Sequence, residues 1–162
     1  MAKAATPAIA ALVAAGADHQ VLQYHHDPRS HDFGAEAVAA LTGAQLVAGQ
    51  ILKTLVLALP AGLAVAVLPV PAKLSLKAAA AALGVPKVAM ADPADAQRSS
   101  GYVLGGISPL GQRRRLPTVL DRGALDFDRV LVSAGKRGLS LAVAPQDLVL
   151  LTDAVVADLC AQ

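Results

Sequence analysis

Hydrophobic and polar positions change along the chain at the spacings of short helices and strands. Near the amino terminus, Thr6-Pro7 is a typical helix start, and Ile9, Leu12 and Val13 follow at the i, i+3 and i+4 spacing of one helical face. Residues 19–24 are typical of a short strand. After a polar loop, residues 35–41 predict a second helix.

The most apolar region, residues 51–70, predicts two paired strands joined at Pro60-Ala61-Gly62. Period-two alternation places Lys53 and Thr54 on opposite faces of the first strand. Both faces are otherwise apolar, so Lys53 enters a region that is mostly buried. Such a lysine either has a functional reason to be there or extends from the strand end into solvent. Lys53 and the turn interrupt the hydrophobic run, so we expect no transmembrane helix.

The remaining chain predicts further helices and strands, separated by glycine, proline and capping residues. Helices are expected over residues 75–83, 92–97, 145–151 and 154–159, and strands over residues 87–90, 116–121, 129–133 and 139–143. This mixture predicts an α/β fold. A length of 162 residues suits one domain, residues 1–162, with a sizeable core.

A glycine-rich stretch, residues 101–111, reads GYVLGGISPLG and carries no charge. Its glycines and proline exclude a continuous helix, and its apolar composition is unusual for a solvated loop. One interpretation is a tight apolar turn between two elements. The other is a pocket wall made of backbone, whose N–H groups face a carbonyl or phosphate oxygen. Composition alone does not choose between them.

Composition and charge narrow the classes of partner. Aromatic residues make up 2% of the chain, which argues against a single-strand nucleic-acid binder built on aromatic platforms. The net charge is only +2, so a polyanion would have to meet a local basic patch. Candidate patches are the run Arg113, Arg114 and Arg115, and the pair Lys136 and Arg137; the run is either a solvated face or a contact for a phosphodiester backbone.

Several other chemistries are not supported by the sequence. Histidines and aspartates gather in residues 25–32, but their spacing does not fit a two-histidine helix motif, and we expect neither a metal nor another cofactor. The turn at residues 133–138 lacks the spacing of a phosphate-binding P-loop. Cys160 has no histidine close in sequence to activate it as a nucleophile. A single cysteine also excludes an intrachain disulfide, which suits a reducing compartment; we expect the cytoplasm.

Several segments together resemble the YbaK-type aminoacyl-tRNA deacylases, which are related to the editing domain of bacterial prolyl-tRNA synthetases. No segment is specific alone, but the set covers nearly the whole chain in order. The segments are YHHDP (24–28), Phe33-Gly34, Lys53-Thr54-Leu55, ADP (91–93), QRS (97–99), Gly101-Tyr102, GGISPLG (105–111), RLPT (115–118), and Ser133 with GKRG (135–138). The chain most resembles the free-standing cysteinyl-tRNA(Pro) deacylase branch.

The resemblance implies a fold and a set of site residues. The family fold is a mixed α/β domain with a curved, barrel-like sheet flanked by helices. The family's pocket lysine falls on Lys53, and its Gly-x-x-x-Pro loop, which holds the 3′ adenosine and the carbonyl end, falls on residues 105–109. The matched site positions are Lys53, Gly105 and Gly106 as catalytic residues, and Tyr24, Phe33, Ile107, Ser108, Pro109 and Ser133 as substrate-binding residues.

The resemblance also implies the reaction, which is deacylation of mischarged cysteinyl-tRNA(Pro). An aminoacyl ester is already reactive, so positioning and oxyanion stabilisation suffice without a dedicated triad. The family is thought to let the substrate's own thiol attack the ester. The implied partners are aminoacyl-tRNA, namely tRNA(Pro) and also tRNA(Cys), and a transient complex with prolyl-tRNA synthetase. Two alternatives stay open: a deacylase for alanyl-tRNA(Pro) or another mischarged tRNA, and a binding module without turnover.

Overall fold

Two β-sheets form the frame of the structure, a computed structural model that describes residues 6–42 and 46–162. The helices are α1 (Pro7–Ala15), α2 (Phe33–Leu41), α3 (Leu76–Leu83), α4 (Pro93–Ser100) and α5 (Pro145–Thr152), with 3₁₀ turns η1 (Ala48–Gln50) and η2 (Arg122–Asp126). The strands are β1 (His19–Gln23), β2 (Leu52–Ala58), β3 (Leu63–Pro69), β4 (Ala89–Met90), β5 (Thr118–Asp121), β6 (Val130–Lys136), β7 (Leu139–Val143) and β8 (Val155–Ala157).

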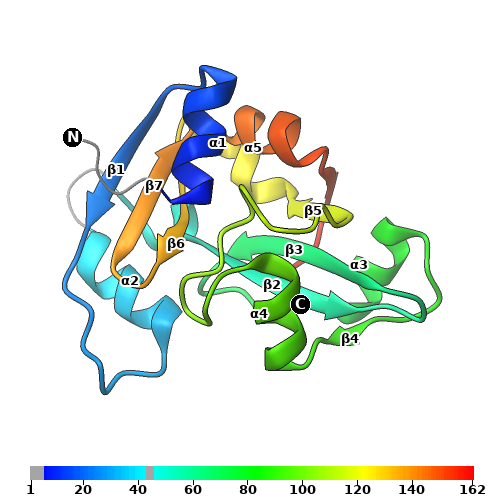
Figure 1. The fold of residues 1–162 in the computed structure, drawn as a ribbon. Helices are drawn as coiled ribbons and strands as arrows, with labels where there is room; N and C mark the ends of the chain where they lie inside the picture. Colours follow the sequence, from blue (N-terminus) through cyan, green and yellow to red (C-terminus); the bar gives the residue numbers. More distant parts are fainter. Residues whose placement is uncertain (1–5, 43–45) are drawn as a thin grey trace.

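The smaller sheet has the strand order β1-β7-β6 and is antiparallel throughout, whereas the larger has the order β4-β2-β3-β5-β8 and is mixed. In Figure 1 the smaller sheet and α2 lie on one side of the molecule, and β2, β3 and β4 with α3 lie on the other. An isolated parallel bridge between Ile51 and Leu131 joins the two sheets. The predicted mixed α/β fold is confirmed, although its sheets are not closed into one barrel.

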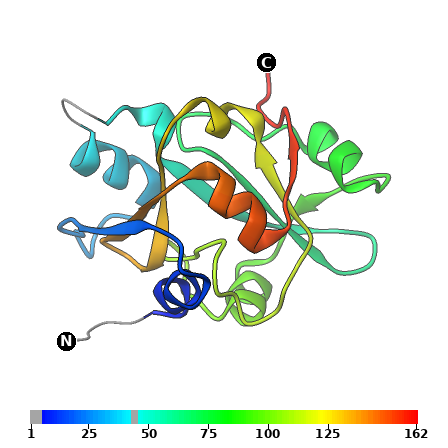
Figure 2. The same cartoon turned by 90° about the horizontal axis from the view of Figure 1, so that it is seen from above.

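Local sequence signals explain most of these elements. The side chains of Thr6 and Ser75 cap α1 and α3 by accepting hydrogen bonds from Ile9 N and Ala78 N. The predicted hairpin of β2 and β3 is present, with Leu52 opposite Pro69 and Ala58 opposite Leu63. Figure 2 shows α5 over the middle of the molecule, with α1 and α4 along one side. Among the described residues, no helix is long and apolar enough to cross a membrane.

The prediction of a helix over residues 154–159 is wrong. Helix α5 ends where Asp153 adopts a left-handed conformation, with φ 54° and ψ 41°, and the chain turns away. Two β-branched residues, Val155 and Val156, then begin β8, in which Val155 pairs with Val119 of β5 in a parallel register. A pairing partner 36 positions earlier decided the structure of this segment, and local pattern could not reveal it.

Candidate active site

A cavity of about 390 Å³ lies where the two sheets meet, a size typical of small-molecule sites. Four parts of the chain supply most of its lining: β2 through residues 52–55, the start of α2 through residues 32–34, the glycine-rich loop through Leu104, Gly105 and Ile107, and β6 through residues 131–133. Tyr24 and Ser140 complete the polar lining on the side of the smaller sheet. The cavity therefore combines residues from distant parts of the chain.

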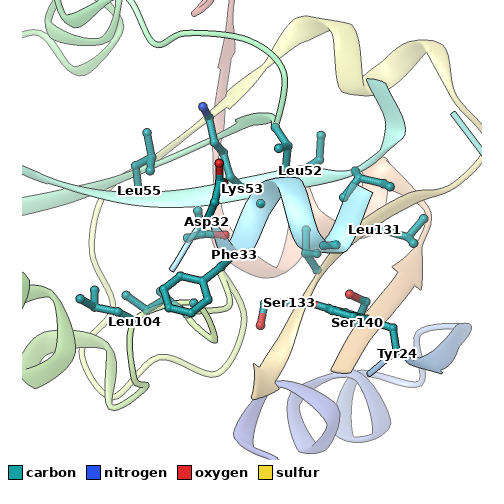
Figure 3. A pocket seen from close by; sticks show the side chains of 18 residues that line it. Tyr24, Asp32, Phe33, Leu52, Lys53, Leu55, Leu104, Leu131, Ser133 and Ser140 are labelled. Atoms are coloured by element: carbon teal, nitrogen blue, oxygen red, sulfur yellow. The ribbon is translucent and has the colours of Figure 1, made fainter. Parts of the chain in front are cut away.

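Lys53 is a half-buried cation of this cavity. Its Nζ donates a hydrogen bond to the carbonyl oxygen of Ala72 at 2.6 Å, which leaves two ammonium donors for other partners. Burial lowers the pKa of Lys53, whereas the neighbouring Cys160 and Asp32 act in the opposite direction. In Figure 3 the amino group of Lys53 points upward, away from Ser133 and Ser140, which lie lower in the view. Lys53 thus places a positive charge at one end of a cavity whose lining is mostly apolar.

The glycine-rich loop enters the cavity wall with its backbone. Gly105 has a φ of +82°, and a Cβ built on it would lie 2.5 Å from Cγ of Phe33. Both the left-handed conformation and the close approach of the ring require glycine here. The amide of Gly106 already donates to Val103 O at 2.9 Å. Within the described part of the chain, the amides of Gly105 and Ile107 have no hydrogen-bond partner, so these two are available as donors.

The loop is held firmly at its carboxyl side. The hydroxyl of the buried Tyr102 donates to Leu110 O at 2.7 Å, and burial raises the pKa of Tyr102 to about 12, which keeps this donor protonated. Three residues of the sequence prediction, Gly106, Ser108 and Pro109, lie outside the cavity lining. Ser108 is fully buried, and its hydroxyl accepts a hydrogen bond from Leu110 N. These three residues therefore act on the cavity only through the conformation of the loop.

The other predicted substrate-binding residues do line the cavity. Phe33 begins α2, whose N-cap is Asp32, and Figure 3 shows its ring beside Leu104. The hydroxyl of Ser133 accepts a hydrogen bond from Gly135 N at 3.2 Å. Tyr24 follows β1, and burial raises the pKa of its hydroxyl, which keeps it neutral. The structure thus brings Tyr24, Phe33 and Ser133 together with Lys53 around one space.

The predicted basic residues fall into two groups. Lys136 and Arg137 lie at the turn between β6 and β7, where Arg137 stacks over Phe33 at 4.5 Å from its ring centroid. The arginine run is exposed beyond the far end of the loop, and the amides of Arg113 and Arg114 donate to Ser100 O and Ser99 O. None of these residues lines the cavity, but Arg137 contacts two residues that do, Leu104 and Phe33.

The described residues show no protein nucleophile prepared for catalysis. Nδ1 of His26 lies 2.6 Å from a carboxylate oxygen of Glu36, and neither residue lines the cavity. Cys160 is half-buried, and its backbone pairs with Leu74 in an isolated bridge near the carboxyl end of the chain. Burial, together with Asp121, raises the pKa of its thiol and opposes thiolate formation. No cluster of potential metal ligands occurs in residues 6–42 and 46–162.

Sequence reasoning missed several lining residues, of which Thr54 is the most informative. Alternation placed it away from Lys53, yet both border the same cavity. Its Oγ1 is a buried side-chain oxygen with no hydrogen-bond partner among the described residues. Leu104 and Ser140 were not named as site residues either, although Leu104 belongs to the glycine-rich stretch; Ser140 of β7 is brought to the cavity by the pairing of β7 with β6.

A family model for the aminoacyl-tRNA editing domain matches residues 31–151, a span that includes every lining segment except Tyr24. The chain belongs to this aminoacyl-tRNA editing family. The resemblance expected from the sequence is thereby confirmed.

Relatives of this editing domain agree with the assignment. EbsC of Enterococcus faecalis (strain ATCC 700802 / V583), which is named as a Cys-tRNA(Pro)/Cys-tRNA(Cys) deacylase, is 39% identical over 126 residues, covering 77% of this chain and 76% of EbsC. A crystal structure described as a trans-editing enzyme for prolyl-tRNA synthetase has a TM-score of 0.81 and 28% identity, covering 100% of this chain and 99% of its own. A scaffold for computationally grafted epitopes has a TM-score of 0.83 and 28% identity, covering 98% and 97%.

Proposed function

We propose that this chain is a trans-editing deacylase that cleaves mischarged cysteinyl-tRNA(Pro). Membership of the aminoacyl-tRNA editing family supports an aminoacyl-tRNA substrate, and the name of EbsC supports the cysteinyl ester. The solved trans-editing enzyme supports action on a tRNA released by prolyl-tRNA synthetase, with which we propose a transient complex. In general terms, without the amino acid or the tRNA specified, the activity is that of a hydrolase acting on aminoacyl-tRNA.

The observation that carries the mechanism is a pair of free backbone amides and an ammonium that belong to the lining of one cavity. The N–H groups of Gly105 and Ile107 are available at the cavity wall, and Lys53 supplies positive charge from another segment. Backbone donors fixed before the reaction stabilise the negative charge that develops on an ester carbonyl oxygen. We assign the amides to this oxyanion. Lys53 is assigned either to the same oxygen or to the ribose and terminal phosphate.

The cysteine of the substrate is the proposed nucleophile. Its sulfur attacks its own ester carbonyl, a C–S bond forms as the ester C–O bond breaks, and the thiol proton passes to the leaving 3′ oxygen. The products are a tRNA with a free 3′ end and a cyclic thioester, which water then opens. This step needs orientation rather than an enzyme base, and effective molarities of well-placed groups reach roughly 10⁵ M or more.

The other predicted residues take supporting roles in this proposal. Tyr24, Phe33 and Ser133 enclose the aminoacyl end, while Ile107, Ser108 and Pro109 hold the loop that receives the terminal adenosine. The basic run of Arg113, Arg114 and Arg115 is proposed to contact tRNA phosphates, because its side chains are exposed and its backbone is tied to α4. Lys136 is proposed to do the same nearer the cavity.

The test is single-turnover release from tRNA(Pro) charged with cysteine, alanine, serine or proline. The cysteinyl ester should be cleaved more than about a hundredfold faster than the seryl ester, the limit expected for a hydrophobic pocket that rejects a near-isostere. Preference for the alanyl ester would instead support an alanyl-tRNA deacylase, and binding without release would support a non-catalytic module. Cys160→Ser should be silent; its inactivity would contradict the substrate-thiol mechanism.

A further inference from the structure

Arg137 contacts two separate segments at the edge of the cavity. Its Nε donates a hydrogen bond to the carbonyl oxygen of Leu104 at 2.7 Å. Its guanidinium also lies 4.5 Å from the centroid of the Phe33 ring, a stacking distance for a cation and an aromatic face. The side chain therefore links the turn between β6 and β7 to the glycine-rich loop and to the start of α2.

The glycine-rich loop fits closely between these partners. On one side, the Phe33 ring occupies the space that a side chain on Gly105 would need. On the other side, a Cβ on Gly106 would lie 3.1 Å from Cα of Lys136. The loop tip, Gly105 and Gly106, is thus enclosed by Phe33 and by the backbone of the turn that carries Arg137. A small displacement of Phe33, of the backbone at Lys136 or of Arg137 would therefore move the tip.

Residues 103–105 of the loop are more exposed than residues 106–110. Val103 is 53% exposed, whereas Ile107 and Leu110 are buried. The amide of Leu104 donates to the side chain of Gln97 at 2.9 Å, and its carbonyl accepts the bond from Arg137. A hydrogen bond from a charged donor is stronger than a neutral one, so the contact with Arg137 is well suited to fix this peptide group.

We propose that Arg137 is a positioning residue, which holds the peptide of Leu104 and Gly105 against Phe33 so that the amides of Gly105 and Ile107 face the cavity. Sequence pattern grouped Arg137 with residues that contact tRNA phosphates, a role that depends on its charge alone. The proposed role depends on its planar fork, because Nε and the guanidinium face make the two contacts at the same time, and a lysine cannot reproduce both. This inference rests on the proposed deacylase activity for its kinetic consequence but not for its structural one.

Arg137→Lys separates the two roles, because it keeps the charge and removes the fork. The first measurement is hydrogen–deuterium exchange of the free protein over residues 103–108. Exchange should be at least several-fold faster in the variant, since the loop tip loses its side-chain anchor. The matched control is Arg122→Lys, an exposed arginine that pairs with Asp158 outside the cavity, and it should leave exchange in this segment unchanged. Unchanged exchange in Arg137→Lys would overturn the inference without any reference to activity.

The second measurement is the single-turnover rate on cysteinyl-tRNA(Pro) at saturating protein. A misplaced loop should lower this rate at least tenfold, with little change in the salt dependence of tRNA binding. A phosphate contact predicts the reverse, namely a normal saturating rate in Arg137→Lys, and this result would also overturn the inference. If the wild-type protein released no amino acid from any charged tRNA, the proposed function would fail, while the exchange experiment would still decide whether Arg137 positions the loop.

Discussion

The ammonium of Lys53 donates a 2.6 Å hydrogen bond to the carbonyl oxygen of Ala72, and this contact decides how the cation is presented to the cavity. Ala72 follows the hairpin of β2 and β3, and its amide donates to Pro69 O at the end of β3, which attaches it to the sheet that carries Lys53. One of the three ammonium donors is fixed, which orients the other two. Lys53 is thus neither a lysine extended freely into solvent nor an unsatisfied buried charge.

Replacing Lys53 should remove one electrostatic contact to the reacting end of the substrate. We expect Lys53→Ala to lower the deacylation rate roughly a hundredfold or more, the scale observed for loss of one oxyanion donor. The fold should survive, because deleting a partly desolvated charge need not destabilise a protein. Lys73→Ala, an exposed lysine close in sequence, is the matched control. A near-normal rate in Lys53→Ala would remove this residue from the mechanism.

The lowered pKa of Lys53 also predicts how stability depends on pH. Burial makes its folded pKa lower than the ordinary value of 10.5, so between these two pKa values the unfolded chain binds more protons than the folded one. The free energy of unfolding of the wild type, relative to Lys53→Met, should therefore increase as pH rises through this window. Urea titrations of both proteins from neutral to alkaline pH measure the difference. A relative loss of stability with rising pH would contradict the burial of this ammonium.

Gly105 should not tolerate a side chain. Gly105→Ala would place a Cβ against the Phe33 ring and strain a left-handed backbone, so both stability and the deacylation rate should fall. Gly84→Ala separates the two causes, since Gly84 has a similar φ of +72° but open space around its Cβ position. That control should cost about 1–2 kcal/mol of stability from backbone strain. Thermal unfolding of both variants should rank Gly105→Ala as the less stable, and equal losses would argue against the contact with Phe33.

Thr54 predicts a gain in stability on losing a hydroxyl. Its Oγ1 is buried without a partner in the described part of the chain, and Val has nearly the same shape. Thr54→Val should raise the free energy of unfolding by about 1 kcal/mol, because an unsatisfied buried hydroxyl is costly. Thr54→Ser, which keeps the hydroxyl and loses a methyl group, should not. Denaturant unfolding measures the change, and destabilisation of Thr54→Val would mean that the hydroxyl has a partner after all.

The exposed arginine run predicts a change in salt dependence without a change in chemistry. Neutralising two of Arg113, Arg114 and Arg115 should weaken tRNA binding and reduce its salt slope by about one unit per lost phosphate contact. The rate at saturating tRNA should stay near the wild-type value, because the run lies outside the cavity. Binding measured over a range of salt concentrations provides the slope. If the slope does not change, the run is a solvated surface.

Local sequence signals predicted helices, strands and turns better than they predicted contacts between residues far apart in the sequence. The caps at Thr6 and Ser75 and the turn between β2 and β3 are encoded within a few residues, and all three are present. The strand β8 was missed because its identity depends on pairing with β5. For the site, resemblance supplied the residue types, but not that Lys53 would bind Ala72 or that Arg137 would stack on Phe33, which are contacts across 19 and 104 positions.

In the proposed mechanism, the atoms that meet the ester differ from those that meet the amino-acid side chain of the substrate. Apart from Lys53, the atoms assigned to the ester are backbone amides of the glycine-rich loop, and a backbone amide is present whatever the side chain of its residue. The atoms that meet the amino-acid side chain belong to exchangeable side chains, such as Leu52 and Leu55 of β2 and Leu131 of β6. Substitutions in these strands can therefore alter which amino acid fits while the chemistry at the carbonyl is preserved. A fold arranged in this way can diversify its substrates gradually, without rebuilding its reactive centre.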